Sequence, residues 1–201
     1  MIYKICQYTA LIILKLFFRL RVTGAGNIPS SGPAIIAANH ASFLDPPIIA
    51  TSIRRSIYFM ARKSLFRIWG FGWLIRQTHA FPVKRGGFDT SGLKRLFDLI
   101  EKGNIVLLFP EGTRSHDGLL QQPHSGAGMV AYRKRVPIIP ALIKGSYSAL
   151  PRTTNMVKFY PLSVKFGVPV RLDEFWGREK GKKTYQDISR KIMQAISEMD
   201  S

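Results

Sequence analysis

The chain has 201 residues, enough for one ordinary domain, and its 46% apolar content argues against disorder. The single cysteine, Cys6, excludes an internal disulfide framework and a four-cysteine zinc site. Thirty Lys and Arg residues against 12 Asp and Glu give a formal net charge of +18, which indicates an anionic partner: nucleic acid, a membrane surface or a phosphorylated substrate.

The excess positive charge is concentrated toward the N-terminus. Residues 1–88 contain 12 basic side chains and one acidic one, Asp45, for a net charge of +11. Residues 89–201 contain 18 basic and 11 acidic side chains, for a net charge of +7. The N-terminal half also holds the most hydrophobic stretch of the chain. Basic and apolar residues in one segment favour a membrane surface over nucleic acid as the partner.

The first 21 residues are apolar with scattered basic side chains. The uninterrupted stretch between Lys4 and Lys15 is shorter than the roughly 20 residues that a membrane-spanning helix needs. Basic residues also follow this stretch, where a secretory signal peptide would be cleaved. We expect residues 1–21 to form a membrane-associating helix in the bilayer interface, and residues 22–201 to form the domain that follows. A spanning helix and a helix packed on the core are the alternatives.

The rest of the chain alternates between short apolar runs and amphipathic segments. The runs predict buried strands at 33–38, 57–61, 80–83, 105–109 and 137–143, and edge strands within 157–166. Helices are expected from an N-cap at Asp45, over 64–75 with a break near Gly70 and Gly72, at 93–100, at 127–135 and after an N-cap at Thr184. This alternation predicts an α/β fold, with a mixed, largely parallel sheet flanked by helices.

Residues 39–45 lie between the first of these strands and a helix, where α/β proteins place reactive groups. Five positions separate His40 from Asp45, so a tight loop can bring the carboxylate to one imidazole nitrogen. The other nitrogen would then serve as a general base. The alternative is that Asp45 only caps its helix and that His40 is an ordinary loop residue.

Residues 109–115, Phe-Pro-Glu-Gly-Thr-Arg-Ser, follow another apolar strand. Gly112 permits a tight turn, Thr113 offers a hydroxyl, and Arg114 offers a planar fork of donors suited to phosphate. A plain charged turn is the alternative. His116, Asp117 and His124 lack a tight metal-ligand spacing, so no metal site is predicted.

Two further segments are less informative by themselves. Residues 81–87 form a basic, glycine-containing loop after a strand, and Arg85 lies within it. Residues 136–140, Val-Pro-Ile-Ile-Pro, carry no reactive side chain and indicate a strand.

Together, in this order, the four segments resemble the glycerolipid acyltransferase family. Its two signature blocks, NHxxxxD and FPEGTRS, match residues 39–45 and 109–115, and its lesser blocks match Arg85 with its neighbours and residues 136–140. The resemblance covers roughly residues 22–170 and implies a glycerol-3-phosphate acyltransferase-like fold. The short form that acylates 1-acylglycerol-3-phosphate is the most similar in layout.

The resemblance implies direct acyl transfer to lysophosphatidic acid, giving phosphatidic acid. His40 would be the general base, oriented by Asp45, and the acceptor hydroxyl would attack an acyl thioester of acyl carrier protein or coenzyme A. Neither a cofactor nor a metal is implied. The substrate-binding residues that the resemblance implies are Asn39, Arg62, Arg85, Glu111, Gly112, Thr113 and Arg114.

We expect a membrane bilayer as partner, without nucleic acid, because the N-terminal half is both basic and apolar. The lack of a secretory signal pattern and a donor made in the cytosol favour the cytoplasmic face of the inner or plasma membrane. One position departs from the family pattern: Pro-His-Ser-Gly at 123–126 replaces Phe-Lys-x-Gly, so that His124 stands for a lysine. Another lysophospholipid or a lyso-aminolipid is an alternative acceptor. A non-enzymatic basic module that binds lipid or nucleic acid is the alternative from another class.

Overall fold

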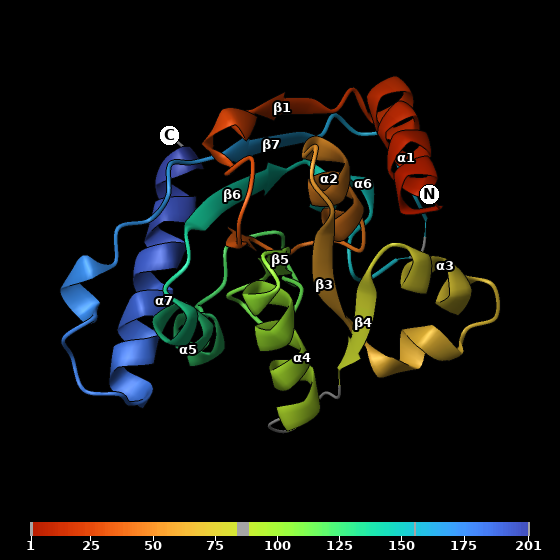
Figure 1. Ribbon diagram of the computed structural model, residues 1–201. Helices are drawn as coiled ribbons and strands as arrows, with labels where there is room; N and C mark the ends of the chain where they lie inside the picture. Colours follow the sequence, from red (N-terminus) through yellow and green to blue (C-terminus); the bar gives the residue numbers. More distant parts are fainter. Residues whose placement is uncertain (1, 84–88, 155, 201) are drawn as a thin grey trace.

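The computed structural model describes residues 2–83, 89–154 and 156–200, and Figure 1 shows one sheet with helices on both faces. Within these residues, seven strands follow the order β1-β7-β6-β2-β5-β3-β4. They are β1 (Arg21–Thr23), β2 (Ala34–Ala38), β3 (Ile57–Arg62), β4 (Ala80–Val83), β5 (Ile105–Leu108), β6 (Ile138–Lys144) and β7 (Ser163–Phe166). Among these seven strands, β6 and β7 are the one antiparallel pair, so the predicted mixed, largely parallel α/β sheet is confirmed.

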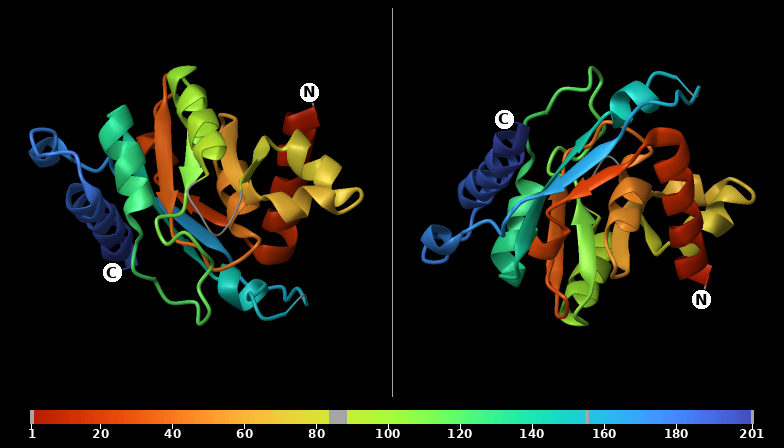
Figure 2. Two further views of the ribbon diagram at one scale, coloured as in Figure 1. Left: turned by 90° about the horizontal axis from the view of Figure 1, so that it is seen from below. Right: turned by 90° about the horizontal axis from the view of Figure 1, so that it is seen from above.

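The helices form a layer on each face of the sheet (Figures 1 and 2). They are α1 (Ile2–Phe18), α2 (Asp45–Ser52), α3 (Phe71–Gln77), α4 (Thr90–Glu101), α5 (Ser125–Lys134), α6 (Ser146–Ala149) and α7 (Lys182–Ser197). Short 3-10 turns cover Ala25–Asn27, Lys63–Arg67, Asp173–Phe175 and Glu198–Asp200. One core lies between the sheet and α1, α2, α3 and α6, and a second core lies between the sheet and α4, α5 and α7.

Strand β2 shows why the central strands are uninterrupted apolar runs. Ile36 belongs to the core on the α1 and α2 side, whereas Ile35 belongs to the core on the α4, α5 and α7 side. Successive strand residues point to opposite faces, so a strand that is covered on both faces has no polar position. All five residues of β2 are buried, as the sequence predicts.

Several predicted boundaries differ from the structure by one to three residues, and three other differences have physical causes. Leu44, not Asp45, is the N-cap of α2, because the Asp45 carboxylate accepts hydrogen bonds from the preceding loop instead. Gly181, not Thr184, is the N-cap of α7, and the Thr184 hydroxyl donates to a preceding carbonyl. Within 157–166 only Ser163–Phe166 form a strand, β7, and it is not at the edge of the sheet, because it pairs with β1 on one side and β6 on the other.

Helix α1 packs on the domain with one of its faces. The Gln7 amide donates to the carbonyls of Ala50 (2.6 Å) and Ile53 (2.8 Å), and Leu14 and Phe18 lie in the core. Its other face leaves seven large apolar side chains exposed. No helix of the described residues has the length and apolarity needed to cross a bilayer. The separate, membrane-associating role of residues 1–21 stays a prediction.

The contact between α5 and α7 predicts a sharp difference between two glycines. A Cβ on Gly128 would lie 1.9 Å from the Tyr185 carbonyl oxygen, whereas a Cβ on Gly126 would meet nothing within 4 Å. We expect Gly128→Ala to lower the free energy of unfolding by about 1–3 kcal/mol, since the two helices must separate. Gly126→Ala, in the same helix, should be neutral or stabilising by up to about 1 kcal/mol. Urea unfolding followed by circular dichroism measures both, and equal midpoints would contradict the close packing.

Candidate active site

The two signature blocks meet at one edge of the sheet. The loop at 39–45 follows β2, and the turn at 109–115 follows β5. The two strands are parallel neighbours, with Ala37 opposite Leu108, so both blocks leave the sheet side by side. In open α/β sheets, the crevice outside the carboxyl ends of the strands is where ligands bind.

His40 and Asp45 form the pair that the spacing predicts. The His40 Nδ1 atom lies 2.8 Å from Oδ2 of Asp45, and the Asp45 side chain is fully buried. The same oxygen accepts the main-chain N–H groups of Ala41 and Ser42, both at 2.7 Å. A carboxylate in this position favours the tautomer with the proton on Nδ1, which leaves Nε2 as the acceptor. The pair can therefore act as a general base.

The imidazole of His40 is also fixed through its ring face. It stacks on Phe109 with a centroid distance of 3.8 Å and an interplanar angle of 13°. The His40 side chain remains 17% exposed, and the hydrogen bond to Asp45 uses Nδ1. The ring is thus held through Nδ1 and one face, and neither contact uses Nε2, the nitrogen that would act on a substrate.

The main chain of His40 connects the two blocks. Its N–H donates to Oε1 of Glu111 (3.1 Å), and its carbonyl accepts the N–H of Ser115 (2.7 Å). Glu111 is 2% exposed, and this burial raises the pKa of its carboxyl to about 7, against the opposing effect of the main-chain N–H groups of His40 and Gln121. Loss of the Glu111 side chain would therefore remove a hydrogen bond made by the His40 main chain.

Arg114 is held through its side chain and its main chain. The guanidinium carbon lies 3.5 Å from the centroid of the Phe43 ring, a cation–π contact. Arg152 donates from Nη1 to the Arg114 carbonyl (3.1 Å) and to the Thr113 hydroxyl (3.4 Å). Gly112 has a φ of +69°, which lets the chain turn sharply before this pair.

Arg152 is a residue of this site that the sequence does not reveal. It follows α6, outside all four family blocks. A β-bridge between Ser42 and Pro151, and a hydrogen bond from the Ser42 hydroxyl to the Leu150 carbonyl, bring it beside the site. No motif surrounds Arg152, so only the tertiary fold identifies it.

The remaining predicted substrate-binding residues lie in different surroundings. Asn39 is buried, and its amide donates to and accepts from the main chain of Ile143 at 3.0 and 2.8 Å, so it attaches the loop to β6. Arg62 ends β3 at the same sheet edge and is exposed. Arg85 lies outside the described residues. The substrate-binding roles of all three stay predictions.

His124, which departs from the family pattern described above, lies against the second block. Its N–H donates to the Pro110 carbonyl at 2.9 Å, and a Cβ on Gly112 would come within 3.0 Å of its ring. His116 lies 2.9 Å from an Arg152 nitrogen. No group of three His, Cys, Asp or Glu side chains in the described part of the chain could hold a metal ion.

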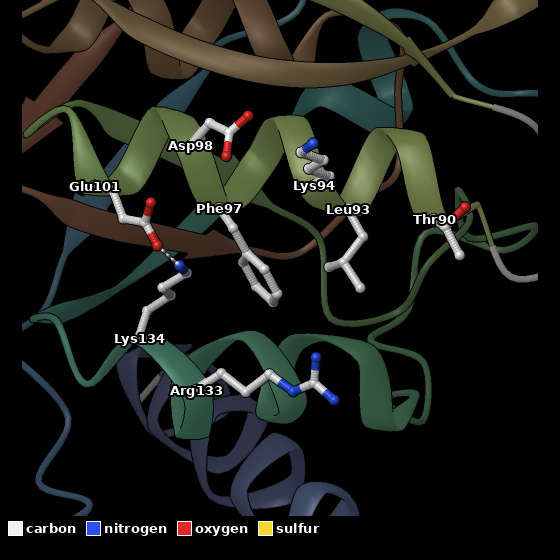
Figure 3. Close-up of a pocket in the computed structure, with 8 residues that line it drawn as sticks. All are labelled: Thr90, Leu93, Lys94, Phe97, Asp98, Glu101, Arg133 and Lys134. Carbon is white, nitrogen blue, oxygen red and sulfur yellow. Dashed lines mark hydrogen bonds and ion pairs between the residues drawn. The ribbon is translucent and has the colours of Figure 1, made fainter.

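A groove of about 400 Å³ lies between α4 and α5, away from this site (Figure 3). Leu93 and Phe97 of α4 line it, and an ion pair between Glu101 and Lys134 crosses it. It lies on the face of the sheet opposite α1 and α2. None of the described candidate residues lines the groove, so it is not part of the candidate site.

Comparisons with known proteins agree with this arrangement. A family model described as Acyltransferase matches residues 19–144. Among solved structures, the crystal structure of PlsC, the 1-acyl-sn-glycerophosphate acyltransferase of Thermotoga maritima, is similar with a TM-score of 0.78 and 26% identity. The similarity covers 99% of this chain and 80% of that one.

Curated relatives are named 1-acyl-sn-glycerol-3-phosphate acyltransferases. One from Bacillus subtilis is 28% identical over 99% of this chain and 97% of its own length. A chloroplastic one from Arabidopsis thaliana is 35% identical over 73% of this chain. The chain spans only 42% of that relative and 43% of a chloroplastic one from Brassica napus.

The buried Glu111 carboxyl predicts a pH-dependent stability. Its pKa is about 7 in the folded chain against 4.5 for an exposed glutamate. Because folding raises the pKa of Glu111, binding of its proton stabilises the folded chain. This stabilisation is complete below the pKa that Glu111 has in the unfolded chain, and it is lost as the pH rises through the pKa of the folded chain. Between about pH 4.5 and pH 8, the natural chain should lose about 3 kcal/mol of unfolding free energy relative to Glu111→Gln. Urea unfolding of both chains measures this difference, and a constant difference would contradict it.

Proposed function

The chain belongs to the acyltransferase family, and we propose that it moves a fatty acyl group from an acyl thioester to the sn-2 hydroxyl of lysophosphatidic acid, giving phosphatidic acid. The observation that carries this proposal is the pair of His40 and Asp45, which lies at the same sheet edge as Arg114 and leaves the His40 side chain partly exposed. The names of the relatives from Bacillus subtilis and Thermotoga maritima support lysophosphatidic acid as the acceptor.

The proposed reaction uses His40 as the proton carrier. Nε2 removes the proton of the acceptor hydroxyl while its oxygen attacks the thioester carbonyl. The new C–O bond forms, the C–S bond breaks, and the departing thiolate takes the proton from the imidazolium. Asp45 stabilises the imidazolium between these steps. The products are an ester and a free thiol, and no acyl-enzyme is required.

The phosphate of the acceptor requires cations near this base. We assign Arg114 to it, together with Arg62 and Arg85, because a guanidinium offers two parallel donors to phosphate oxygens. Glu111 carries a carboxyl that would repel phosphate when ionised, so its proposed contribution acts through the His40 main chain. Gly112 and Thr113 shape the turn from which Arg114 extends.

The chemistry of the proposed substrates indicates where in the cell the protein acts. Lysophosphatidic acid and phosphatidic acid are membrane lipids, so we place the protein at a bilayer, on the cytoplasmic face where acyl carrier protein and coenzyme A thioesters are made. The reaction as proposed needs no cofactor besides the thioester. A panel of lysophospholipid and lyso-aminolipid acceptors, assayed with both thioesters and followed by product mass spectrometry, tests the acceptor and the donor. A product only from another acceptor would overturn the assignment of lysophosphatidic acid.

Loss of the base should abolish most of the activity. We expect His40→Ala to lower kcat by about 100- to 10,000-fold, the usual contribution of a general base. Asp45→Asn should also lower kcat, because an amide can fix the wrong tautomer. Asp98→Asn, an exposed acid on α4, is the matched control and should retain activity. Near-normal turnover by folded His40→Ala protein would rule out the assigned base.

The ring of Phe43 should control acceptor binding through Arg114. Phe43→Leu keeps an apolar side chain but removes the π face, so the acceptor KM should rise about two- to thirty-fold, equivalent to 0.5–2 kcal/mol. Phe43→Tyr keeps the face and should bind the acceptor normally. Arg114→Ala should raise the acceptor KM more than the donor KM. Initial rates with each substrate varied in turn separate the two constants, and equal effects of Arg114→Ala on both would refute the phosphate role.

A further inference from the structure

Exposed apolar side chains gather in three segments of this chain. Sixteen of the 20 exposed large apolar side chains in the described residues lie on α1, at 68–74 and at 156–160. Within the middle segment they are Ile68, Trp69, Phe71, Trp73 and Leu74. A patch of this extent on a soluble surface marks an interaction site.

The three segments are joined by aromatic contacts. The Tyr3 ring of α1 stacks on His79, just beyond α3, with centroids 4.3 Å apart. At the other end of the helix, Phe17 stacks on Phe159 at 5.3 Å. Figures 1 and 2 place α1 and α3 on the same side of the molecule in every view. The three segments therefore lie next to one another, and their exposed side chains are together called the apolar face below.

The turn at 68–74 exposes Trp69 at its tip and is held in place by packing behind it. Trp69 is 98% exposed, and the next residue, Gly70, has a φ of +70°. Behind the tip, the Gly72 N–H donates to the Ile68 carbonyl at 2.7 Å, and a Cβ on Gly72 would lie 2.4 Å from the Phe66 carbonyl oxygen. This packing fixes the turn, so the exposure of Trp69 is a property of the folded state.

The charges around this face identify its partner. Arg67 and Arg76 flank the turn, and α1 carries Lys4 and Lys15. The only acidic residue in the first 88 positions is Asp45, which is buried at the candidate site. Cations surrounding tryptophan and aliphatic side chains suit the interface of an anionic bilayer. If two copies of this chain met through this face, the positive side chains of one copy would instead lie opposite those of the other.

We propose that the turn at 68–74 is a second bilayer anchor, which inserts Trp69 into an anionic lipid surface beside α1. The proposal deepens the proposed function, since lipid substrates are what such an anchor would serve. Strand β3 ends at Arg62 and continues through the 3-10 turn into this anchor. Insertion of the anchor therefore holds Arg62 near the lipid headgroups, where the acceptor phosphate lies.

Tryptophan fluorescence tests the insertion directly, because the chain has three tryptophans. One protein, Trp73→Phe with Trp176→Phe, keeps Trp69 alone. A second, Trp69→Phe with Trp73→Phe, keeps Trp176, which packs against the core on the other face of the sheet. In phosphatidylglycerol vesicles with brominated acyl chains, we expect quenching and a blue shift for Trp69 and neither for Trp176. Vesicle-bound protein whose Trp69 is not quenched would overturn the proposal.

Vesicle sedimentation provides the matched comparison. Trp69→Ser with Trp73→Ser should weaken binding to phosphatidylglycerol vesicles by about ten-fold or more. Leu119→Ser with Val168→Ser removes two exposed apolar side chains outside the three segments and should leave binding unchanged. Equal losses in both variants would overturn the proposal. So would a dimer of the natural chain in solution that only the tryptophan variant dissociates, since the turn would then contact a second copy.

Activity on dispersed lysophosphatidic acid in detergent separates this proposal from the proposed function. The tryptophan variant should keep its activity there and lose it only on vesicles. A natural chain that binds vesicles through Trp69 but transfers no acyl group would refute the proposed function and leave the anchor standing. A variant that loses activity equally in detergent and on vesicles would show that the turn serves the fold or the site, and would overturn the anchor.

Discussion

The site depends on the hydrogen bonds that hold His40 between two loops. Its Nδ1 contacts Asp45, its N–H contacts Glu111, and its carbonyl contacts Ser115, while its ring lies on Phe109. All four partners lie in the segments that follow β2 and β5, which are parallel neighbours in the sheet. The position of the base is therefore a consequence of strand pairing, and a shift in the register of these strands would separate the groups.

Two buried carboxyls within this arrangement differ in their hydrogen bonds. A buried ionised carboxylate is costly unless donors surround it. Oδ2 of Asp45 receives the imidazole and two main-chain N–H groups within 2.8 Å, and Asp45 is the first residue of α2, where the helix dipole favours negative charge. Glu111 receives the main-chain N–H groups of His40, at 3.1 Å, and of Gln121, and burial raises its pKa to about 7. The two acids sit on either side of one histidine but suit different tasks: one orients the ring, and the other holds the main chain.

Much of this could be predicted from the sequence, because the information is local. The runs at β2 and β5 are wholly apolar, and the polar blocks follow them directly, so the strands and their burial follow from the pattern. The spacing of His40 and Asp45 allows their pairing, which the structure contains. Contacts between distant segments could not be predicted. The Arg152 guanidinium reaches Arg114 across 38 positions, and β1 is a strand only because Arg21 pairs with Ser163. Asp45 was expected as an N-cap because the pattern does not show that loop N–H groups compete for its carboxylate.

The placement of helix α1 could not be predicted from its sequence pattern. Its contacts bear on how β3 and His40 would be oriented at a lipid surface. Its pattern allowed either a helix in the bilayer interface or one packed on the core, and the structure packs one face while exposing the other. The packed face is attached firmly to the sheet: the Ile57 N–H donates to the Tyr3 hydroxyl, and His79 lies stacked between Tyr3 and Tyr58. Because Ile57 and Tyr58 belong to β3, a surface that bound the exposed face of α1 would also fix the direction of β3. The edge at which β3 ends is the edge that carries His40, so the attachment of α1 would determine how the base faces a lipid surface.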